Sequence, residues 1–195
     1  VGTVGKLMPS FYITGKETHV GEPYKGLDPN QIASEITREF NLNMEYCDIA
    51  DGEVALPPIT LRQQDLKTEY SVQIARNSLV YFNYATHNST PDQVMEKMIK
   101  GATKAFQITI DDLNAQYKKY TEASSYPFEP LPWKARVMSY NELLEKVKAE
   151  RGAEVDERIE ALSKELLKDP TVDDRIFAMK TVEMVHNMWS DKDPV

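Results

Sequence analysis

The fold is organised around Gly15-Lys-Glu-Thr-His19-Val-Gly-Glu-Pro23-Tyr-Lys-Gly26-Leu-Asp28-Pro29-Asn-Gln31, which joins a strand end, a loop and a helix start. Glycine and proline punctuate the loop, and an aspartate followed by proline is typical of the first residues of a helix. The pattern predicts that His19 is held on a framed loop, where binding and catalytic groups often lie. An alternative remains, in which His19 only satisfies a hydrogen bond within the loop.

The residues around this stretch predict alternating strands and helices. We expect a strand over 3–14, with Pro9 where no ladder donor is needed or at a bulge, a helix over 28–43, and an extended edge segment over 54–61. A turn over 62–69 and a strand over 70–86, bent near 75–78, should follow. The capping box Thr90–Gln93 opens a long helix to about Glu122, and a proline-rich linker leads to a short strand over 135–138.

This order of elements predicts an α+β fold of the ferredoxin-like, split βαβ type, with two helices on one face of an antiparallel sheet. A second capping box, Ser139–Glu142, opens a helix to about Arg151. A further helix should run to Lys168, and a last helix should follow Asp169-Pro170-Thr171, with Trp189 on its apolar side. We therefore expect a ferredoxin-like domain over 1–138 and a helical extension, packed on it, over 139–195.

Composition limits the function classes. The 195 residues suffice for one core with a helical appendage, and a net charge of −8 argues against a nucleic-acid surface. The apolar runs are too short to span a membrane. The single cysteine, Cys47, cannot form an internal disulfide, which favours a reducing, cytoplasmic location.

Catalytic constellations are missing from the sequence. The three histidines are scattered and none occurs in a metal-ligand motif, so we expect no metal site in this chain. The chain starts at Val1 without methionine and stops abruptly after Pro194-Val195, which indicates an excision from a longer protein.

The runs over 1–12 and 15–23 resemble the lid, or dimerisation, domain of the di-zinc metallopeptidase family that includes aminoacylases, carboxypeptidase G and succinyl-diaminopimelate desuccinylase. Gly15, His19, Pro23 and Gly26 fall at the spacings of that lid, and Asp28 stands where the family usually has asparagine. Segments within 58–73 and the extension after residue 140 are most similar to a branch of the family linked with arginine utilisation.

The resemblance implies a parent enzyme that hydrolyses amide bonds with two zinc ions and a carboxylate base. Those groups would lie in a catalytic domain outside this chain, so the chain alone is predicted to be inactive. In a homodimer, His19 would reach in trans into the partner subunit's active site and hold the substrate carbonyl or its oxyanion. The substrate would be a small peptide or an acylated amino acid.

Two positions depart from the family pattern. Ser71 stands where many lids have a substrate-binding asparagine, and Ala85 stands where they have an arginine. Ser71, Gln73 and Asn83 are therefore the candidate substrate contacts. The alternative from another class is a free-standing ferredoxin-like interaction module without an enzymatic parent.

Overall fold

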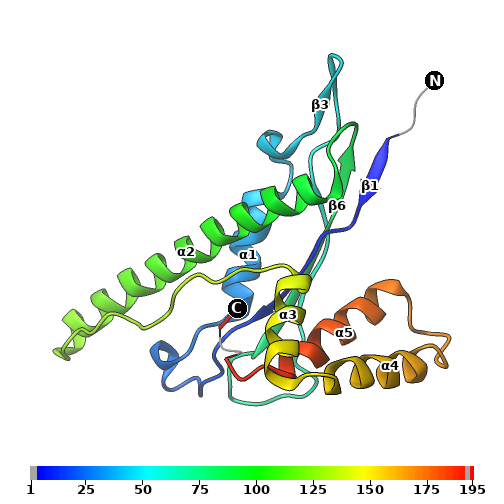
Figure 1. Ribbon diagram of the computed structural model, residues 1–195. Helices are drawn as coiled ribbons and strands as arrows, with labels where there is room; N and C mark the ends of the chain where they lie inside the picture. Colours follow the sequence, from blue (N-terminus) through cyan, green and yellow to red (C-terminus); the bar gives the residue numbers. More distant parts are fainter. Residues whose placement is uncertain (1–3, 192–193) are drawn as a thin grey trace. The chain divides into compact units, whose positions relative to one another are not determined.

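The computed structural model describes residues 4–191 and 194–195 (Figure 1). The chain divides into two compact units, Val1–Val137 with Pro194–Val195 and Met138–Asp193. The expected strand start at Thr3 lies outside the described residues. The first unit contains the sheet and all of the predicted site residues: His19, Ser71, Gln73 and Asn83.

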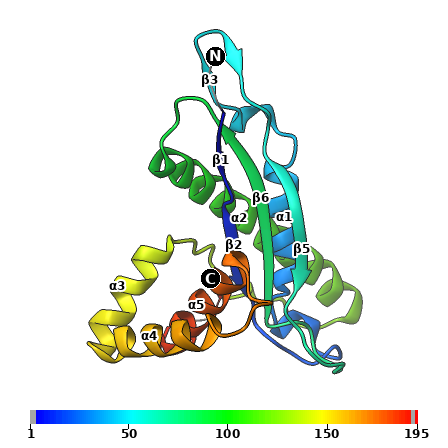
Figure 2. The ribbon, with the colours of Figure 1, turned by 90° about the vertical axis from the view of Figure 1, so that its right-hand side faces the viewer.

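The sheet of the first unit is built around β6 (Asn77–Thr86), its longest strand. This strand pairs antiparallel with β1 (Gly5–Leu7) and β2 (Ser10–Thr14) along one edge and with β5 (Ile59–Asp65) along the other, as Figure 2 shows. An antiparallel sheet is what the predicted α+β class requires, and the fold class is confirmed.

Strands β1 and β2 are one strand interrupted at Met8 and Pro9. Leu7 pairs with Tyr84 and Ser10 with Tyr81, so the register continues through the interruption without an extra residue. The carbonyl of Pro9 still accepts a 3.1 Å hydrogen bond from the N–H of Phe82. Pro9 therefore keeps its place in the ladder through its acceptor alone, as predicted for a residue without an N–H.

Two predicted boundaries on the β5–β6 side are wrong. Residues 62–65 continue strand β5 instead of turning, and residues 70–76 form the connecting loop instead of a strand. Charged residues over 62–69 favour a turn on sequence grounds, but the side chains of β5 are largely exposed at a sheet edge, where polar residues are tolerated. The predicted bend near Ala75 lies just before the start of β6.

Two helices pack on one face of this sheet. Helix α1 (Pro29–Phe40) begins after Asp28, whose side chain accepts a 2.9 Å hydrogen bond from the N–H of Asn30. Helix α2 (Pro91–Ser124) begins with the capping box between Thr90 and Gln93. The sequence predicts both helix starts, because an oxygen at the N-cap satisfies an otherwise unpaired backbone donor.

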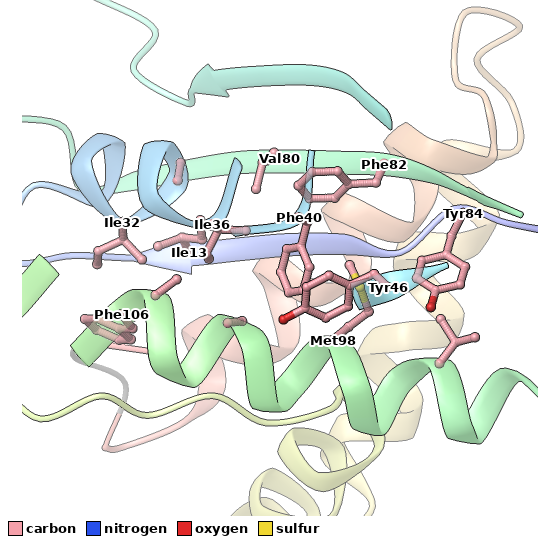
Figure 3. Packing of buried hydrophobic residues seen from close by; sticks show 14 of the residues in the cluster. Ile13, Ile32, Ile36, Phe40, Tyr46, Val80, Phe82, Tyr84, Met98 and Phe106 are labelled. Carbon is pink, nitrogen blue, oxygen red and sulfur yellow. The ribbon is translucent and has the colours of Figure 1, made fainter. Parts of the chain in front are cut away.

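The core lies between the helices and the sheet (Figure 3). Val80, Phe82 and Tyr84 of β6 are buried in it, and Phe40 of α1 packs edge-on against Phe82 with ring centroids 5.6 Å apart. Gly101 allows α2 to approach, because a Cβ there would lie 2.6 Å from Cε1 of Phe40 and would also overlap the Tyr46 hydroxyl. Aromatic rings thus set the distance between the two helices.

The predicted strand over 135–138 is not formed. Trp133, Ala135 and Val137 instead pack against the core as an irregular segment. Three prolines precede this segment, and proline cannot donate to a ladder. Among its described residues, the first unit accordingly has the β-α-β-β-α part of the split arrangement without a fourth strand. The backbone of Val195 exchanges hydrogen bonds of 2.7 and 3.0 Å with Thr14 at the edge of β2.

A small hairpin lies between α1 and β5. Its strands β3 (Ile49–Ala50) and β4 (Glu53–Val54) are joined by Asp51 and Gly52, which both have positive φ. This is the two-residue turn that suits the twist of a hairpin. A short 3-10 helix, η2 (Met44–Tyr46), precedes it, and η1 (Pro23–Lys25) follows His19.

The second unit consists of α3 (Tyr140–Arg151), α4 (Glu154–Leu166) and α5 (Asp174–Met188). The Ser139–Glu142 capping box forms as predicted. Five side chains form its core: Leu143, Val147, Val155, Val185 and Trp189. His186 is buried at the end of α5 with its ring edge-on to Trp189.

Candidate functional site

Two glycines allow the His19 loop to close on itself. The segment leaving β2 bonds to the segment that leads into α1 through paired hydrogen bonds between Lys16 and Leu27, of 2.8 and 2.9 Å. A Cβ at Gly15 would overlap the Leu27 carbonyl, and one at Gly26 would lie 2.6 Å from the Lys16 carbonyl oxygen. Glycine at both positions is therefore a packing requirement of the loop.

The strand-like segment 18–20 pairs with segment 72–74 of the β5–β6 loop. The N–H of Val20 donates to the carbonyl of Val72 at 2.9 Å, and the N–H of Ile74 donates to the carbonyl of Thr18 at 3.0 Å. His19 lies opposite Gln73 as a result. Two of the predicted site residues, which are far apart in the sequence, are thus brought together.

The ring of His19 is exposed and oriented. Its Nδ1 accepts a 3.0 Å hydrogen bond from the backbone N–H of Gly21, and its carbonyl accepts from the N–H of Glu22 at 2.9 Å. A neutral imidazole whose Nδ1 accepts carries its proton on Nε2. The loop therefore presents Nε2–H as a donor for a group outside the loop.

An open hollow of about 310 Å³ adjoins segment 71–73. Its lining includes Ser71, Gln73 and the charged side chains of Glu17, Lys67 and Arg76. Lys67 spans part of it, since its Nζ donates to the carbonyls of Ser71 at 3.0 Å and Gln73 at 2.7 Å. Ser71 and Gln73 thus line a polar hollow, and Gln73 also lies opposite His19.

Tyr24 anchors the other side of the loop. It lies in η1, and its ring stacks on Tyr117 of α2 with centroids 4.6 Å apart and contacts Tyr120 at 5.3 Å. The His19 loop is consequently fixed both to the β5–β6 loop and to helix α2. A histidine held from two sides loses little further entropy when it binds a ligand.

Asn83 lies apart from this group. It pairs with Ile59 in the outer half of β6, six residues beyond Asn77, which corresponds to about 20 Å along a strand. Ala85, which stands where the family has an arginine, is further along the same strand. The structure brings together His19, Ser71 and Gln73 but does not bring Asn83 to them.

A second polar cluster, around Asp48, has a structural role. Oδ2 of buried Asp48 accepts hydrogen bonds from the backbone N–H groups of His87, Asn88 and Ser89 at 2.7–2.8 Å. These bonds, with Ser89 the strongest contributor, lower the pKa of Asp48 to about 2. Within residues 4–191 and 194–195, no three His, Cys, Asp or Glu side chains are placed to hold a metal ion.

Sequence reasoning missed the residues that support His19. Lys67 donates to two backbone carbonyls, a contact that leaves no spacing pattern in the sequence, and Gly21 acts through its backbone N–H. Tyr24 lies within the stretch 15–31, yet its partner Tyr117 belongs to a distant helix. Only the glycine that follows His19 by two positions gives a usable signal, since a ring near the backbone favours glycine there.

Two proteins of Bacillus subtilis (strain 168) are similar to this chain. Protein RocB is 37% identical over 159 residues, which are 82% of this chain and 28% of RocB. The chain is homologous to part of RocB. The uncharacterized protein YqjN is 31% identical over 194 residues, which are 100% of this chain and 35% of YqjN.

The chain spans about a third of the length of these curated relatives. No family model matches it. The predicted resemblance to the branch linked with arginine utilisation, to which RocB belongs, is confirmed, and the match fits a segment of a larger RocB-like protein. Across the described part of the chain, no helix combines the length and apolar character that a membrane crossing needs.

Proposed function

We propose that this chain is the lid and dimerisation part of a RocB-type, zinc-dependent amide hydrolase, and that His19 enters the partner subunit's active site. The observation that carries the proposal is the exposed imidazole whose Nδ1 accepts from Gly21, which leaves Nε2–H as an outward donor. A fixed donor of this kind stabilises the negative charge that develops on a carbonyl oxygen during amide hydrolysis. The homology to RocB supports a larger parent protein.

The parent's metal chemistry is assigned to residues outside this chain. The described residues do not provide a set of ligands that fits two zinc ions. When bound in the remainder of the parent, the ions would polarise the amide and activate water. This chain's own contribution is the hydrogen-bond donor of His19, with the polar groups at Ser71 and Gln73 beside it. The proposed substrate is a small peptide or acylated amino acid, in a context of arginine utilisation.

A homodimer is proposed because His19 has to act on a second subunit. Among the described strands, β5 pairs only with β6, and an exposed edge strand is a site for pairing with another chain. Several exposed apolar side chains occur in the sequence between α1 and β5 and within the first residues of that strand: Leu42, Met44, Ile49, Val54, Leu56, Ile59 and Leu61. The cytoplasm is the proposed compartment, in keeping with the single thiol of Cys47.

The test uses a full-length protein that contains this chain, assayed on a panel of dipeptides and N-acyl amino acids. His19→Ala should lower kcat by about a hundredfold or more, since single oxyanion donors contribute at that level. His87→Ala is the matched control, because His87 bonds to Asp48 through its backbone, which the substitution keeps. An unchanged kcat for His19→Ala would return His19 to a purely structural role.

Action in trans has a separate test. A His19→Ala protein and a protein that lacks the catalytic carboxylate in the remainder of the parent are each expected to be inactive. Mixing and re-associating the two should restore part of the activity, because one mixed site then receives both intact groups. No recovery from verified heterodimers would contradict supply from the partner subunit.

A further inference from the structure

We propose that Lys67 is a positioning residue for His19, acting as a clamp on the far side of segment 71–74. This inference rests on the proposed function only in giving the position of His19 a catalytic purpose. The clamp itself is a feature of the chain, and it can be tested without any activity.

The hydrogen bonds of segment 71–74 alternate between two sides. The carbonyl of Val72 and the N–H of Ile74 face residues 18–20, where they bond to Val20 and Thr18. In an extended chain, successive carbonyls point in opposite directions. The carbonyls of Ser71 and Gln73 accordingly face away from His19, and Nζ of Lys67 donates to both, at 3.0 and 2.7 Å.

Lys67 thus occupies the position that a further strand would hold. A single ammonium group offers three donors, so it can bond to two carbonyls at once. Lys67 is itself placed by its backbone N–H, which donates to Oδ1 of Asp65 at 3.0 Å. The N–H of Leu66 bonds to the carbonyl of Asn77 at 2.9 Å and closes the neck of the loop.

The loop depends on such a clamp because few of its side chains are buried. Between Lys67 and Gln73 every side chain is exposed, and Tyr70 is 92% exposed. A loop with little apolar burial is held mainly by its hydrogen bonds and opens readily. Loosening segment 71–74 would break its hydrogen bonds to residues 18–20. The His19 backbone would then move, and the imidazole would lose its fixed direction.

The experiment is amide hydrogen exchange and ring ¹⁵N spectroscopy on the whole 195-residue chain. In Lys67→Met, the N–H groups of Val20 and Ile74 should exchange roughly tenfold faster, the factor that corresponds to about one net hydrogen bond. The fraction of His19 with its proton on Nε2 should fall in the same variant. Lys67→Arg, which keeps the charge and several donors, should restore both values.

Lys97→Met is the control, since it removes an equal charge from an exposed position on α2. Unchanged exchange at Val20 and Ile74 in Lys67→Met would overturn the clamp, whatever the role of His19. Faster exchange over the whole chain would also overturn it, by showing a general loss of stability. In the full-length protein, Lys67→Met should lower kcat with little change in KM. Only this last measurement depends on the proposed function.

Discussion

The backbone N–H of Gly21 donates to Nδ1 of His19 over 3.0 Å, so the two residues form a closed local unit within the loop. A Cβ at position 21 would lie 3.1 Å from that nitrogen, which is closer than side-chain carbons normally approach. The direction of the imidazole therefore depends on a residue that has no side chain. In a neutral imidazole, this hydrogen bond assigns the ring proton to Nε2.

Replacing Gly21 should disturb His19 without unfolding the chain. In Gly21→Ala, the added methyl group pushes against the ring, and the fraction of His19 protonated on Nε2 should fall, as measured from ring ¹⁵N shifts. Val20→Ala is the neighbouring control, since it trims an exposed side chain and keeps the N–H bonded to Val72. Equal tautomer fractions in Gly21→Ala and the unmodified chain would contradict the role given to Gly21.

The sequence predicts the site in part. Gly15, Pro23 and Gly26 indicate a framed loop because glycine and proline leave local signals. The pairing of His19 with Gln73 depends on the loop between β5 and β6. The residue pattern wrongly predicts a strand there, so the sequence does not indicate this pairing. The two carbonyls to which Lys67 donates are placed by chain geometry, and any residue type at positions 71 and 73 would carry them. Spacing alone therefore does not predict these contacts.

Tyr24 should contribute to the stability of the loop through its stack on α2. Tyr24→Ala removes the contacts with Tyr117 and Tyr120, and we expect a loss of about 1–3 kcal/mol in the free energy of unfolding, from aromatic pairing together with burial. Tyr24→Phe keeps the ring and should stay within about 0.5 kcal/mol of the unmodified chain. Urea unfolding measures both values.

A second tyrosine provides the comparison for that result. Tyr70 is 92% exposed, so Tyr70→Ala should leave the free energy of unfolding nearly unchanged. If Tyr24→Ala were as neutral as Tyr70→Ala, the stack would not hold the loop, and the η1 segment would need another anchor.

The sequence predicts elements well where the signal is local, and poorly where the element depends on pairing or packing with distant residues. Asp28, Thr90 and Ser139 mark three helix starts because caps act within one turn. The polar residues of β5 form a strand because β6 supplies their hydrogen bonds, and that pairing is non-local. The expected strand near Ala135 does not form, because this segment packs against the core but has no neighbouring strand among the described residues to supply backbone hydrogen bonds.

Gly101 should be sensitive to a single methyl group. Alanine is the better helix former, so on propensity alone Gly101→Ala would stabilise α2 by roughly 1 kcal/mol. The new Cβ would lie 2.6 Å from Phe40 and would overlap the Tyr46 hydroxyl, and overpacking of a core costs about 1–3 kcal/mol. We expect a net loss in the thermal midpoint. Lys100→Ala, at an exposed neighbouring position, is the control; a higher midpoint for Gly101→Ala would show that the rings move aside.

Asp48 links stability to pH. Its carboxylate accepts three backbone hydrogen bonds in the folded chain, which lower its pKa to about 2, whereas an aspartate in an unfolded chain has a pKa of about 3.9. The folded state therefore binds this proton less tightly than the unfolded state. The stabilisation is complete above about pH 4 and is lost as the pH falls toward 2.

Asp48→Asn should accordingly be less stable at pH 7, by about 2–3 kcal/mol, because hydrogen bonds to a charged acceptor become hydrogen bonds to a neutral one. The difference from the unmodified chain should narrow between about pH 4 and pH 2, where the native carboxylate gains its proton. Asp51→Asn is the control, since residue 51 lies exposed in the β3–β4 turn with positive φ, a conformation that asparagine also adopts. Urea unfolding at several pH values measures the difference, and a constant gap for Asp48→Asn would show that ionisation of Asp48 does not hold the loop after β6.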